Sequence, residues 1–295
     1  MAGATADSKP AVDSARAPGQ LFVVATPIGN LQDITERARR VLCEVTLVAA
    51  EDTRRSRKLL QHLGSRARCV ALHQHNEERR LKQIVATLRA GDDVALISDA
   101  GTPLISDPGY LLVRAVRQAG ITAVPVPGPS AITAALSIAA LPTERFCFEG
   151  FLPARDKARV VRLQELLSER RTMVFFEAPH RILAALRSLC DVFGGERPAT
   201  LARELTKQFE TVVHGDLHTL LDCLQHEPDH QRGEFVIVVG GAPHNLHRDH
   251  DANAVLQTLL EELPPAKAAR IAARLTGESR KVLYQLALRL NAGMP

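Results

Sequence analysis

Short apolar runs alternate with amphipathic segments through the first half of the chain. The runs at residues 21–25, 46–50 and 94–97 have the length of buried strands, whereas residues 77–90 carry apolar side chains at helical spacing. Strands that alternate with helices favour βαβ units and a parallel sheet. The pattern therefore predicts an N-terminal α/β domain over residues 21–131.

The second half of the chain carries a different pattern. Strands predicted at residues 172–176, 199–203 and 235–239 no longer alternate strictly with helices, and a charged helix is predicted over residues 156–170. Loss of strict alternation favours a mixed sheet. We expect a second α/β domain over residues 132–243.

Three short helical patterns follow a polar, histidine-rich linker, and together they predict a small helical domain over residues 252–292. Lys267, Arg270 and Arg280 give it a basic face, as in a helix-turn-helix bundle that binds nucleic acid. A helical tail whose cations face solvent is an equally good interpretation. The helices are expected at residues 252–263, 265–275 and 279–290.

The composition narrows the class of protein. The chain has 295 residues with 45% hydrophobic side chains, and its net charge of +4 is compatible with nucleic acid but does not establish it. Five scattered cysteines without a CxxC pair argue for a reducing cytoplasm and against disulfides or a zinc site. Residues 1–20 are expected to be a disordered extension, not a signal peptide. No apolar run is long enough to span a membrane, so we expect a cytoplasmic protein.

The loops after the predicted strands carry the chemistry. The longest, residues 98–109, contains two prolines that stiffen it and two glycines that permit close backbone approach. Neither GxGxxG nor GxxxxGK[ST] occurs, so nucleotide phosphates are not the expected ligand. The loops predict a crevice for a zwitterionic small molecule between the two domains. They lie at residues 26–30, 98–109, 127–130, 177–181 and 203–207.

Several of these segments are similar to motifs of the tetrapyrrole methylase superfamily, in particular of its branch that acts on ribosomal RNA. The resemblance extends over residues 21–290. It implies an α/β, two-domain tetrapyrrole-methylase-like fold with a C-terminal helical (helix-turn-helix-like) appendage, in a homodimer. The motifs are ATPIGNL (25–31), AEDTR (50–54), HNE (75–77), SDAGTPLISDPG (98–109), EGFLP (149–153) and LARELTK (201–207).

The resemblance also implies an activity and a cofactor. The expected reaction is methylation of the ribose 2′-oxygen of a decoding-site cytidine in 16S rRNA of the small ribosomal subunit, with S-adenosylmethionine as donor. By the same resemblance, the donor-binding positions are Pro27, Asp99, Gly101, Thr102, Ile105, Ser130, Ala131, Phe176, Glu177, Ala202 and Leu205.

The ribose hydroxyl must lose its proton during such a reaction, and three side chains near strand ends are candidates to accept it. Glu177 is the first, unless it forms a purely structural pair with Arg181. Glu204 and Lys207 are the others, unless they pair with each other across one turn. Asp99 either binds the donor or caps the turn that follows it.

Basic and polar residues outside the loops are candidates for RNA contacts. Lys157 and Arg159 at the start of a predicted helix either contact phosphates or form a solvated face. The same two interpretations apply to Arg54 and Arg57, and to His75 and Asn76. The resemblance adds weight to RNA contact only for His75 and Asn76.

Two other functions remain open from the sequence. The first is a methyltransferase that acts on a tetrapyrrole or another small molecule; Gly101-Thr102-Pro103 departs from the Gly-Asp-Pro loop of tetrapyrrole-modifying members and disfavours it. The second is a non-catalytic RNA-binding assembly factor, which the dense set of loops at the strand ends disfavours.

Overall fold

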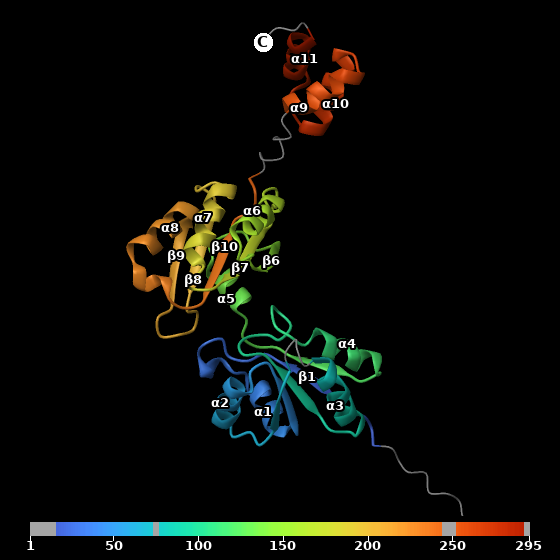
Figure 1. Ribbon diagram of the computed structural model, residues 1–295, viewed down its shortest axis with the longest axis vertical. Coiled ribbons are helices and arrows are strands. Elements are labelled where there is room, and N and C mark those ends of the chain that lie inside the picture. The colour runs from blue at the N-terminus through green and yellow to red at the C-terminus, as the bar shows by residue number, and fades with distance from the viewer. Residues whose placement is uncertain (1–15, 73–76, 244–251, 292–295) are drawn as a thin grey trace, which may run out of the picture. The chain divides into compact units, whose positions relative to one another are not determined.

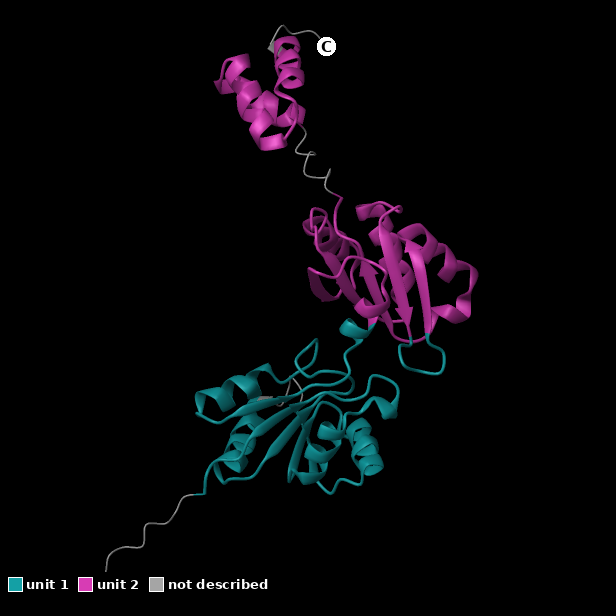
Figure 2. Cartoon of the chain, turned by 180° about the vertical axis from the view of Figure 1, so that it is seen from behind, with its two compact units in different colours: residues 1–134, 204–210 teal, residues 135–203, 211–295 magenta. Residues whose placement is uncertain are grey.

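The chain forms two compact units in the computed structural model, which describes residues 16–72, 77–243 and 252–291 (Figure 2). Unit 1 comprises the chain up to Ala134 together with Glu204–Glu210, and unit 2 comprises Ala135–Arg203 and the chain from Thr211 onward. Each unit is built on a sheet of its own (Figure 1).

The sheet of unit 1 has five parallel strands in the order β3-β2-β4-β1-β5. Because β1 lies between β4 and β5, the loops that follow these three strands leave the sheet side by side at its carboxyl edge. The strands are β1 (Leu21–Val24), β2 (Leu47–Ala50), β3 (Arg68–Ala71), β4 (Val94–Ile97) and β5 (Ala123–Val126).

Helices cover both faces of this sheet, as the continuous apolar strands require. Leu47 and Ala49 of β2 pack in the core with α3 and α4, whereas Val48 and Ala50 pack in the core with α1 and α2. Short polar connections carry the chain between layers. The helices are η1 (Leu31–Asp33), α1 (Glu36–Glu44), α2 (Thr53–Leu63), α3 (Glu77–Arg89), α4 (Tyr110–Gln118) and, across the unit boundary, α5 (Ala131–Ile138).

The sheet of unit 2 is mixed, which confirms the prediction from its sequence pattern. Its order is β6-β7-β10-β8-β9; only β6 and β7 run parallel. The antiparallel pairing puts Glu177 and Arg203 on either side of Phe235, so the ends of β7 and β8 share one edge. The strands are β6 (Phe146–Phe151), β7 (Thr172–Glu177), β8 (Pro198–Arg203), β9 (Thr211–Asp216) and β10 (Phe235–Val239).

The helices of unit 2 pack on one face of its sheet, around Phe175 and Leu163. The charged helix predicted over 156–170 ends at Glu165, because the chain turns at Leu166 and the Leu166 N–H bonds to the Leu163 carbonyl. Strand β9 and helix α8 have no counterpart among the elements expected from the sequence. The helices are α6 (Asp156–Glu165), α7 (Ile182–Phe193), α8 (Leu217–His226) and η2 (Pro228–Gln231).

The last three helices form the expected helical appendage around a core of their own. Leu256, Ala272 and Leu283 are buried in it, and Gly277 ends the middle helix in the left-handed conformation that glycine tolerates best. The helices are α9 (Ala252–Glu262), α10 (Pro265–Thr276) and α11 (Arg280–Asn291). Within the described ranges of the chain, none of the helices has both the length and the apolarity that a membrane crossing requires.

Candidate functional site

Three loops at the carboxyl edge of unit 1 are joined by hydrogen bonds. The Thr26 N–H donates to the Gly101 carbonyl at 2.9 Å, and the Gly101 N–H donates back to the Thr26 carbonyl at 3.0 Å. The Thr102 hydroxyl donates to the Pro129 carbonyl at 3.2 Å. The loops after β1, β4 and β5 therefore form one surface, in which Pro27, Gly101, Thr102 and Ser130 come together.

The loop at residues 98–109 holds its backbone in uncommon conformations. Leu104 and Ser106 have φ angles of 74° and 65°, which side chains larger than glycine rarely adopt. Gly101 has a φ angle of 80°, and a Cβ added there would point between the Ile28 side chain and the Pro129 carbonyl. Backbone strain of this kind concentrates at ligand sites. At Gly101 the positive φ, and not a lack of space, requires glycine, because an added Cβ would lie at an ordinary contact distance of 3.4 Å from Ile28 Cγ2. Ile105 extends from the same loop with 41% of its surface exposed.

The segment Glu204–Glu210 lies against the first loop of unit 1. A Cβ added at Gly29 would stand 2.4 Å from Lys207 Cγ and 3.0 Å from the Leu205 carbonyl oxygen, so only glycine fits this approach. The Thr206 hydroxyl is buried and has no hydrogen-bond partner among the described residues. A buried hydroxyl left without a protein partner calls for a water, an ion or a ligand group to complete its hydrogen bonding.

Glu204 and Lys207 pair across one turn, as one interpretation of the sequence had it. Lys207 Nζ lies 2.8 Å from Glu204 Oε1, and both side chains keep part of their surface exposed. Glu204 and Thr206 have φ angles of 50° and 66°. Two non-glycine residues in the left-handed region within three positions make this a strained turn.

Asp99 is held by the neighbouring connection after β2. Its Oδ1 accepts the Asp52 N–H at 3.0 Å, and its Oδ2 lies 3.2 Å from Arg55 Nη1. Burial, together with the carboxylates of Asp107 and Asp99, raises the pKa of the Glu51 carboxyl in the same region. The Asp99 carboxylate thus ties the long loop to the first turn of α2.

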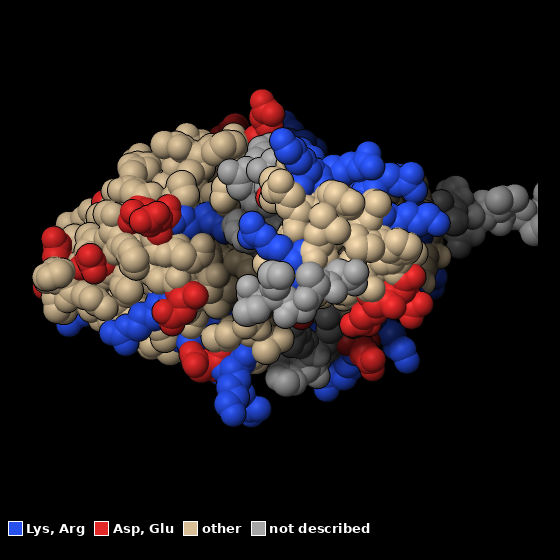
Figure 3. Space-filling model, turned by 90° about the horizontal axis from the view of Figure 1, so that it is seen from above, with Lys and Arg blue, Asp and Glu red and all other residues tan. Residues whose placement is uncertain are grey.

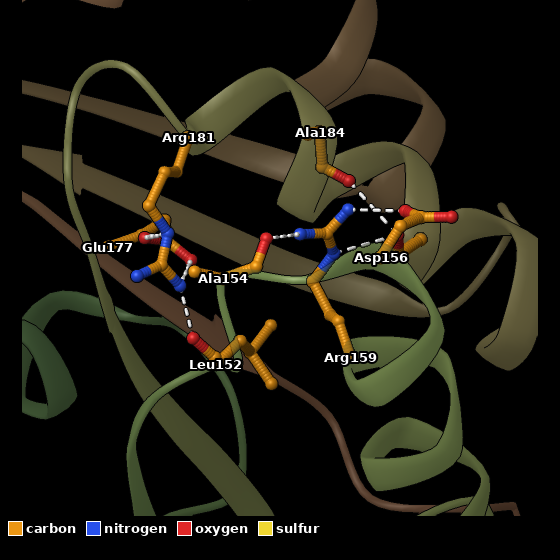
Figure 4. A network of polar contacts seen from close by, with 8 residues as sticks. Leu152, Ala154, Asp156, Arg159, Glu177, Arg181 and Ala184 are labelled. Atoms are coloured by element: carbon orange, nitrogen blue, oxygen red, sulfur yellow. Dashed lines mark hydrogen bonds and ion pairs between the residues drawn. The ribbon is translucent and has the colours of Figure 1, made fainter.

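Glu177 at the end of β7 is paired with Arg181, so the structural alternative weighed for it is realised in its contacts (Figure 4). Its Oε1 lies 3.0 Å from Arg181 Nε and accepts the Ala178 N–H at 2.9 Å, while its Oε2 accepts from Arg181 Nη2 at 3.2 Å. The side chain is 1% exposed. Burial raises the pKa of the Glu177 carboxyl, and the Ala178 N–H and Arg181 offset part of that rise.

Arg159 is neither a phosphate contact nor part of a solvated face, contrary to both sequence interpretations. It is buried, and its guanidinium bonds to the Ser188 hydroxyl at 2.9 Å and to the Asp156 carboxylate at 2.5 Å (Figure 4). A third bond runs to the Ala154 carbonyl. Arg159 therefore joins the first turn of α6 to α7.

The other donor-binding candidates fall at defined places within each unit. Phe176 and Ala202 pair with the same residue of β10, Val236, and so stand in one row at the edge that carries Glu177. Ala131 begins α5 in unit 1, and Leu205 is buried in the segment that belongs to unit 1.

The cationic candidates lie on helix surfaces. Arg54 and Arg57 are exposed on α2, and Lys157 is exposed on α6. Lys267 and Arg270 on α10 and Arg280 on α11 are exposed as well, and lysine and arginine side chains stand on the surface seen in Figure 3. His75 and Asn76 lie outside the described residues.

The chain is a two-sheet α/β protein, in which a parallel sheet with three joined loops is followed by a mixed sheet with a carboxylate-bearing edge. Residues 20–221 match the family described as tetrapyrrole (corrin/porphyrin) methylases, and residues 247–291 match a C-terminal helix-turn-helix domain described as RsmI C-terminal HTH domain. The chain belongs to the tetrapyrrole methylase family.

Relatives that match nearly the whole chain narrow the family to one enzyme. A protein of Pseudomonas aeruginosa PAO1 is 55% identical over 92% of this chain and 97% of its own length. One of Xylella fastidiosa Temecula1 is 52% identical over 90% of this chain and 98% of its own length. Both are named ribosomal RNA small subunit methyltransferase I, so the chain is similar to that enzyme in all its parts.

Solved structures show the same fold at lower identity. A cobalt precorrin-4 methyltransferase has a TM-score of 0.58 at 17% identity and covers 75% of this chain and 94% of its own. A uroporphyrin-III C-methyltransferase from Thermus thermophilus, in complex with S-adenosylhomocysteine, has a TM-score of 0.51 at 17% identity and covers 75% of this chain and 97% of its own. The protein is a methyltransferase, and S-adenosylmethionine is its methyl donor.

The residues at the edge of unit 1 fit this donor. Hydrogen bonds bring the backbone of Gly101 and Thr102 against Thr26 and Pro129, and the Thr206 hydroxyl has no hydrogen-bond partner among the described residues. Exposed Ile105 provides an apolar contact for a ring or a thioether carbon. Backbone, hydroxyl and aliphatic groups suit a zwitterion with a purine base better than they suit a phosphate.

Proposed function

We propose that the enzyme methylates the ribose 2′-oxygen of a decoding-site cytidine in 16S rRNA of the small ribosomal subunit. The observation that carries the proposal is the end-to-end similarity to ribosomal RNA small subunit methyltransferases I, which includes the helical appendage. The structures of small-molecule methylases match over more than nine-tenths of their own length yet cover only 75% of this chain. The remaining quarter therefore has no counterpart in them.

We propose as donor-binding residues those that the family resemblance implies. In unit 1 the holding groups are the backbone around Pro27 and Gly101, the Thr102 and Ile105 side chains, and Ser130, Ala131 and Leu205. In unit 2 they are Phe176 and Ala202. When bound, the donor supplies an electrophilic methyl group on a sulfonium. Asp99 contributes by fixing the loop, since both of its carboxylate oxygens already have partners.

We assign proton acceptance from the ribose hydroxyl to Glu204, with Lys207 balancing its charge. The pair lies in the strained turn that touches the Gly29 loop, and each side chain is partly exposed. In this assignment the hydroxyl O–H bond breaks and its proton moves to the Glu204 carboxylate. Glu177 is less suited to the task because Arg181 and the Ala178 N–H occupy its oxygens.

The proposal also covers the partners. Exposed cations on α2, α6 and the appendage are the sequence-predicted contacts to rRNA phosphates, namely Arg54, Arg57, Lys157, Lys267, Arg270 and Arg280. A homodimer stays a prediction from the family resemblance, and a cytoplasmic location stays a prediction from the scattered cysteines and the lack of a long apolar run in the sequence.

The test is methylation with a radiolabelled donor. Purified small subunits and deproteinised 16S rRNA, both from cells that lack the modification, are offered beside a precorrin-like tetrapyrrole. The expected product is 2′-O-methylcytidine in nuclease digests of the rRNA. Label in the tetrapyrrole, or binding of RNA without any affinity for the donor, would exclude the proposal in favour of one of the two other functions.

Removal of residues 252–295 tests the appendage. Because its three helices pack around their own core, the cores around the two sheets are expected to stay intact after the deletion. We expect rRNA methylation at limiting RNA to fall at least tenfold, with donor affinity by calorimetry unchanged. An unchanged rate would remove the appendage from RNA recognition.

A further inference from the structure

Three phenylalanines gather on one face of unit 2, at the edge formed by β6 and β7. The ring of Phe176 makes edge contacts to Phe148, at a centroid distance of 4.8 Å, and to Phe151, at 5.7 Å. Phe151 is 52% exposed, although aromatic side chains are usually covered. Strand β6 has no neighbour on its outer side among the described strands.

A β-bulge puts Phe148 and Phe151 on the same face. Phe148 pairs with Val174 and Phe151 with Phe176, but the register shifts between Phe148 and Gly150. Without the extra residue, side chains three positions apart would point to opposite faces of the sheet. The bulge therefore turns Phe151 away from the helix-covered core and toward solvent beside Phe176, the kind of re-aiming for which bulges are used next to functional sites.

The backbone on both sides of Phe151 is fixed. Gly150 has a φ angle of 68°, which a residue with a side chain adopts only under strain. Leu152 is buried, and its carbonyl accepts a hydrogen bond from Arg181, the partner of Glu177 (Figure 4). An exposed ring on such a rigid backbone loses little entropy when it binds a flat partner.

The charged residues that flank Phe151 in the sequence favour a polyanion. The carboxylate of Glu149 is neutralised by Arg162, at 2.6 Å. At the start of α6, Arg155 and Lys157 are exposed, and no ion pair is found for either within the part of the chain that the structure describes. One exposed ring followed in the chain, four and six residues later, by two exposed cations without ion pairs is a combination that suits single-stranded nucleic acid: stacking for a base and positive charge for its phosphates.

We propose that Phe151 is a base-stacking residue for an unpaired pyrimidine of the RNA substrate, with Arg155 and Lys157 on the phosphates that flank this nucleotide. The inference rests on the proposed function and names a residue that positions its substrate. A ribose in a folded RNA is reached more easily when its base is unstacked from its neighbours, and a ring that receives such a base offsets the lost stacking. In this proposal the bulge exposes the Phe151 ring, the fixed backbone holds it in place, and the two cations bind the neighbouring phosphates.

The experiment compares Phe151 variants of the full-length enzyme. The probe is a short single-stranded RNA in which one cytidine is replaced by the fluorescent analogue pyrrolocytidine. The variants are Phe151→Ala, Phe151→Leu and Phe151→Trp. The matched control is Phe146→Ala, which removes an exposed phenylalanine from the other end of the same strand.

Stacking predicts a distinct order of affinities. We expect Phe151→Ala and Phe151→Leu to weaken probe binding about 5- to 100-fold, the range for loss of a stacked base, and to abolish the quenching of the analogue. Phe151→Trp and the control keep both, and all variants keep their affinity for the donor. Full affinity of the leucine variant would show that only apolar contact matters and would overturn the proposal.

Two other results would also overturn it. If sedimentation shows that Phe151→Ala turns a dimer into a monomer, and RNA affinity falls only in proportion to the dimer lost, the face belongs to a second copy of the chain. If the wild type is active and Phe151→Ala methylates and binds RNA equally well, the stacking role is refuted but the proposed function is not. A wild type that neither binds nor methylates RNA would refute the proposed function itself.

Salt dependence tests the two cations separately. For single strands, each neutralised phosphate adds about −0.7 to the slope of log affinity against log salt. The double variant with Arg155→Met and Lys157→Met should lower the magnitude of this slope by about 1.4, while leaving the quenching at low salt in place. An unchanged slope would remove both cations from the contact.

Discussion

Replacement of Arg181 by methionine separates the structural role of Glu177 from a catalytic one. The change removes the guanidinium that meets both oxygens of a carboxylate with 1% of its surface exposed. It also removes a donor to the Leu152 carbonyl. Removing one partner of a buried ion pair costs about 3–5 kcal/mol. Because the Ala178 N–H still reaches Glu177, we expect the lower end, about 3 kcal/mol.

The loss of stability caused by Arg181→Met should be larger at high pH than at low pH. Burial already raises the pKa of Glu177 in the folded protein above its unfolded value, and loss of Arg181 raises this pKa further. The penalty therefore belongs to the ionised carboxylate: it is present above the folded pKa and is relieved as pH falls through it. The relief amounts to at most about 1.4 kcal/mol for each pH unit. Arg181→Met should therefore destabilise the protein less at pH 5.5 than at pH 7.5.

Hydrogen exchange of the β7 and α7 peptides is the appropriate assay, because a chain with two units need not unfold in one step. Arg187→Met, an exposed position on the same helix, is the control and should change stability by less than about 0.5 kcal/mol. The double variant with Glu177→Gln and Arg181→Met leaves no unpaired charge and should recover about 2 kcal/mol of the loss. A coupling below about 0.5 kcal/mol, or a loss that is equal at both pH values, would refute the reasoning.

Two further changes probe other contacts. Gly29→Ala puts a Cβ 2.4 Å from Lys207 Cγ and should push the strained turn away, so calorimetry should show at least a tenfold loss of donor affinity. The control Gly64→Ala meets nothing within 4 Å and, although the φ of 74° at this helix end costs it some stability, should keep the donor affinity. Glu169 bonds to Arg171, and this bond lowers the pKa of its carboxyl from 4.5 to about 2. A lowered folded pKa stabilises the protein above the unfolded value, so urea unfolding of Glu169→Gln should show a deficit of about 1 kcal/mol at pH 6 that vanishes as pH falls from 4.5 toward 2.

The sequence predicted the layers of unit 1 because its strands are buried on both faces. Val94 to Ile97 have no polar position, and such a run between two helical patterns can only be a central strand of a parallel sheet. The sequence pattern does not indicate strand β9, because its residues are at least partly exposed and its last three, His214, Gly215 and Asp216, are not apolar. The helix after it carries a usable signal: Asp216 caps it through the Thr219 N–H, and Leu220 and Leu224 repeat at helical spacing.

The spacing of residues in the sequence could predict ion pairs within the site. It could not predict which other atoms these side chains contact in the folded protein. Glu177 and Arg181 stand four residues apart, and so an ion pair was an open alternative. Arg181 also reaches the carbonyl of Leu152, from a strand that neighbours β7 only in the folded sheet. The Thr206 hydroxyl became a candidate only through its burial without a partner, a property that belongs to the packed turn and not to the residue type.

The face on which Phe151 lies could not be predicted from the spacing of residues in the strand. A regular strand would have given Phe151 the face of Cys147, which packs on the helix-covered core, and would have separated it from Phe148. Glu149 and Gly150 instead absorb one extra residue, because Gly150 takes a positive φ and Arg162 holds the Glu149 carboxylate. A period-two pattern counts residues and assumes unbroken pairing, so a single bulge reverses every assignment beyond it. The side chain that emerges on the unexpected face is the one that the structure leaves free for a partner.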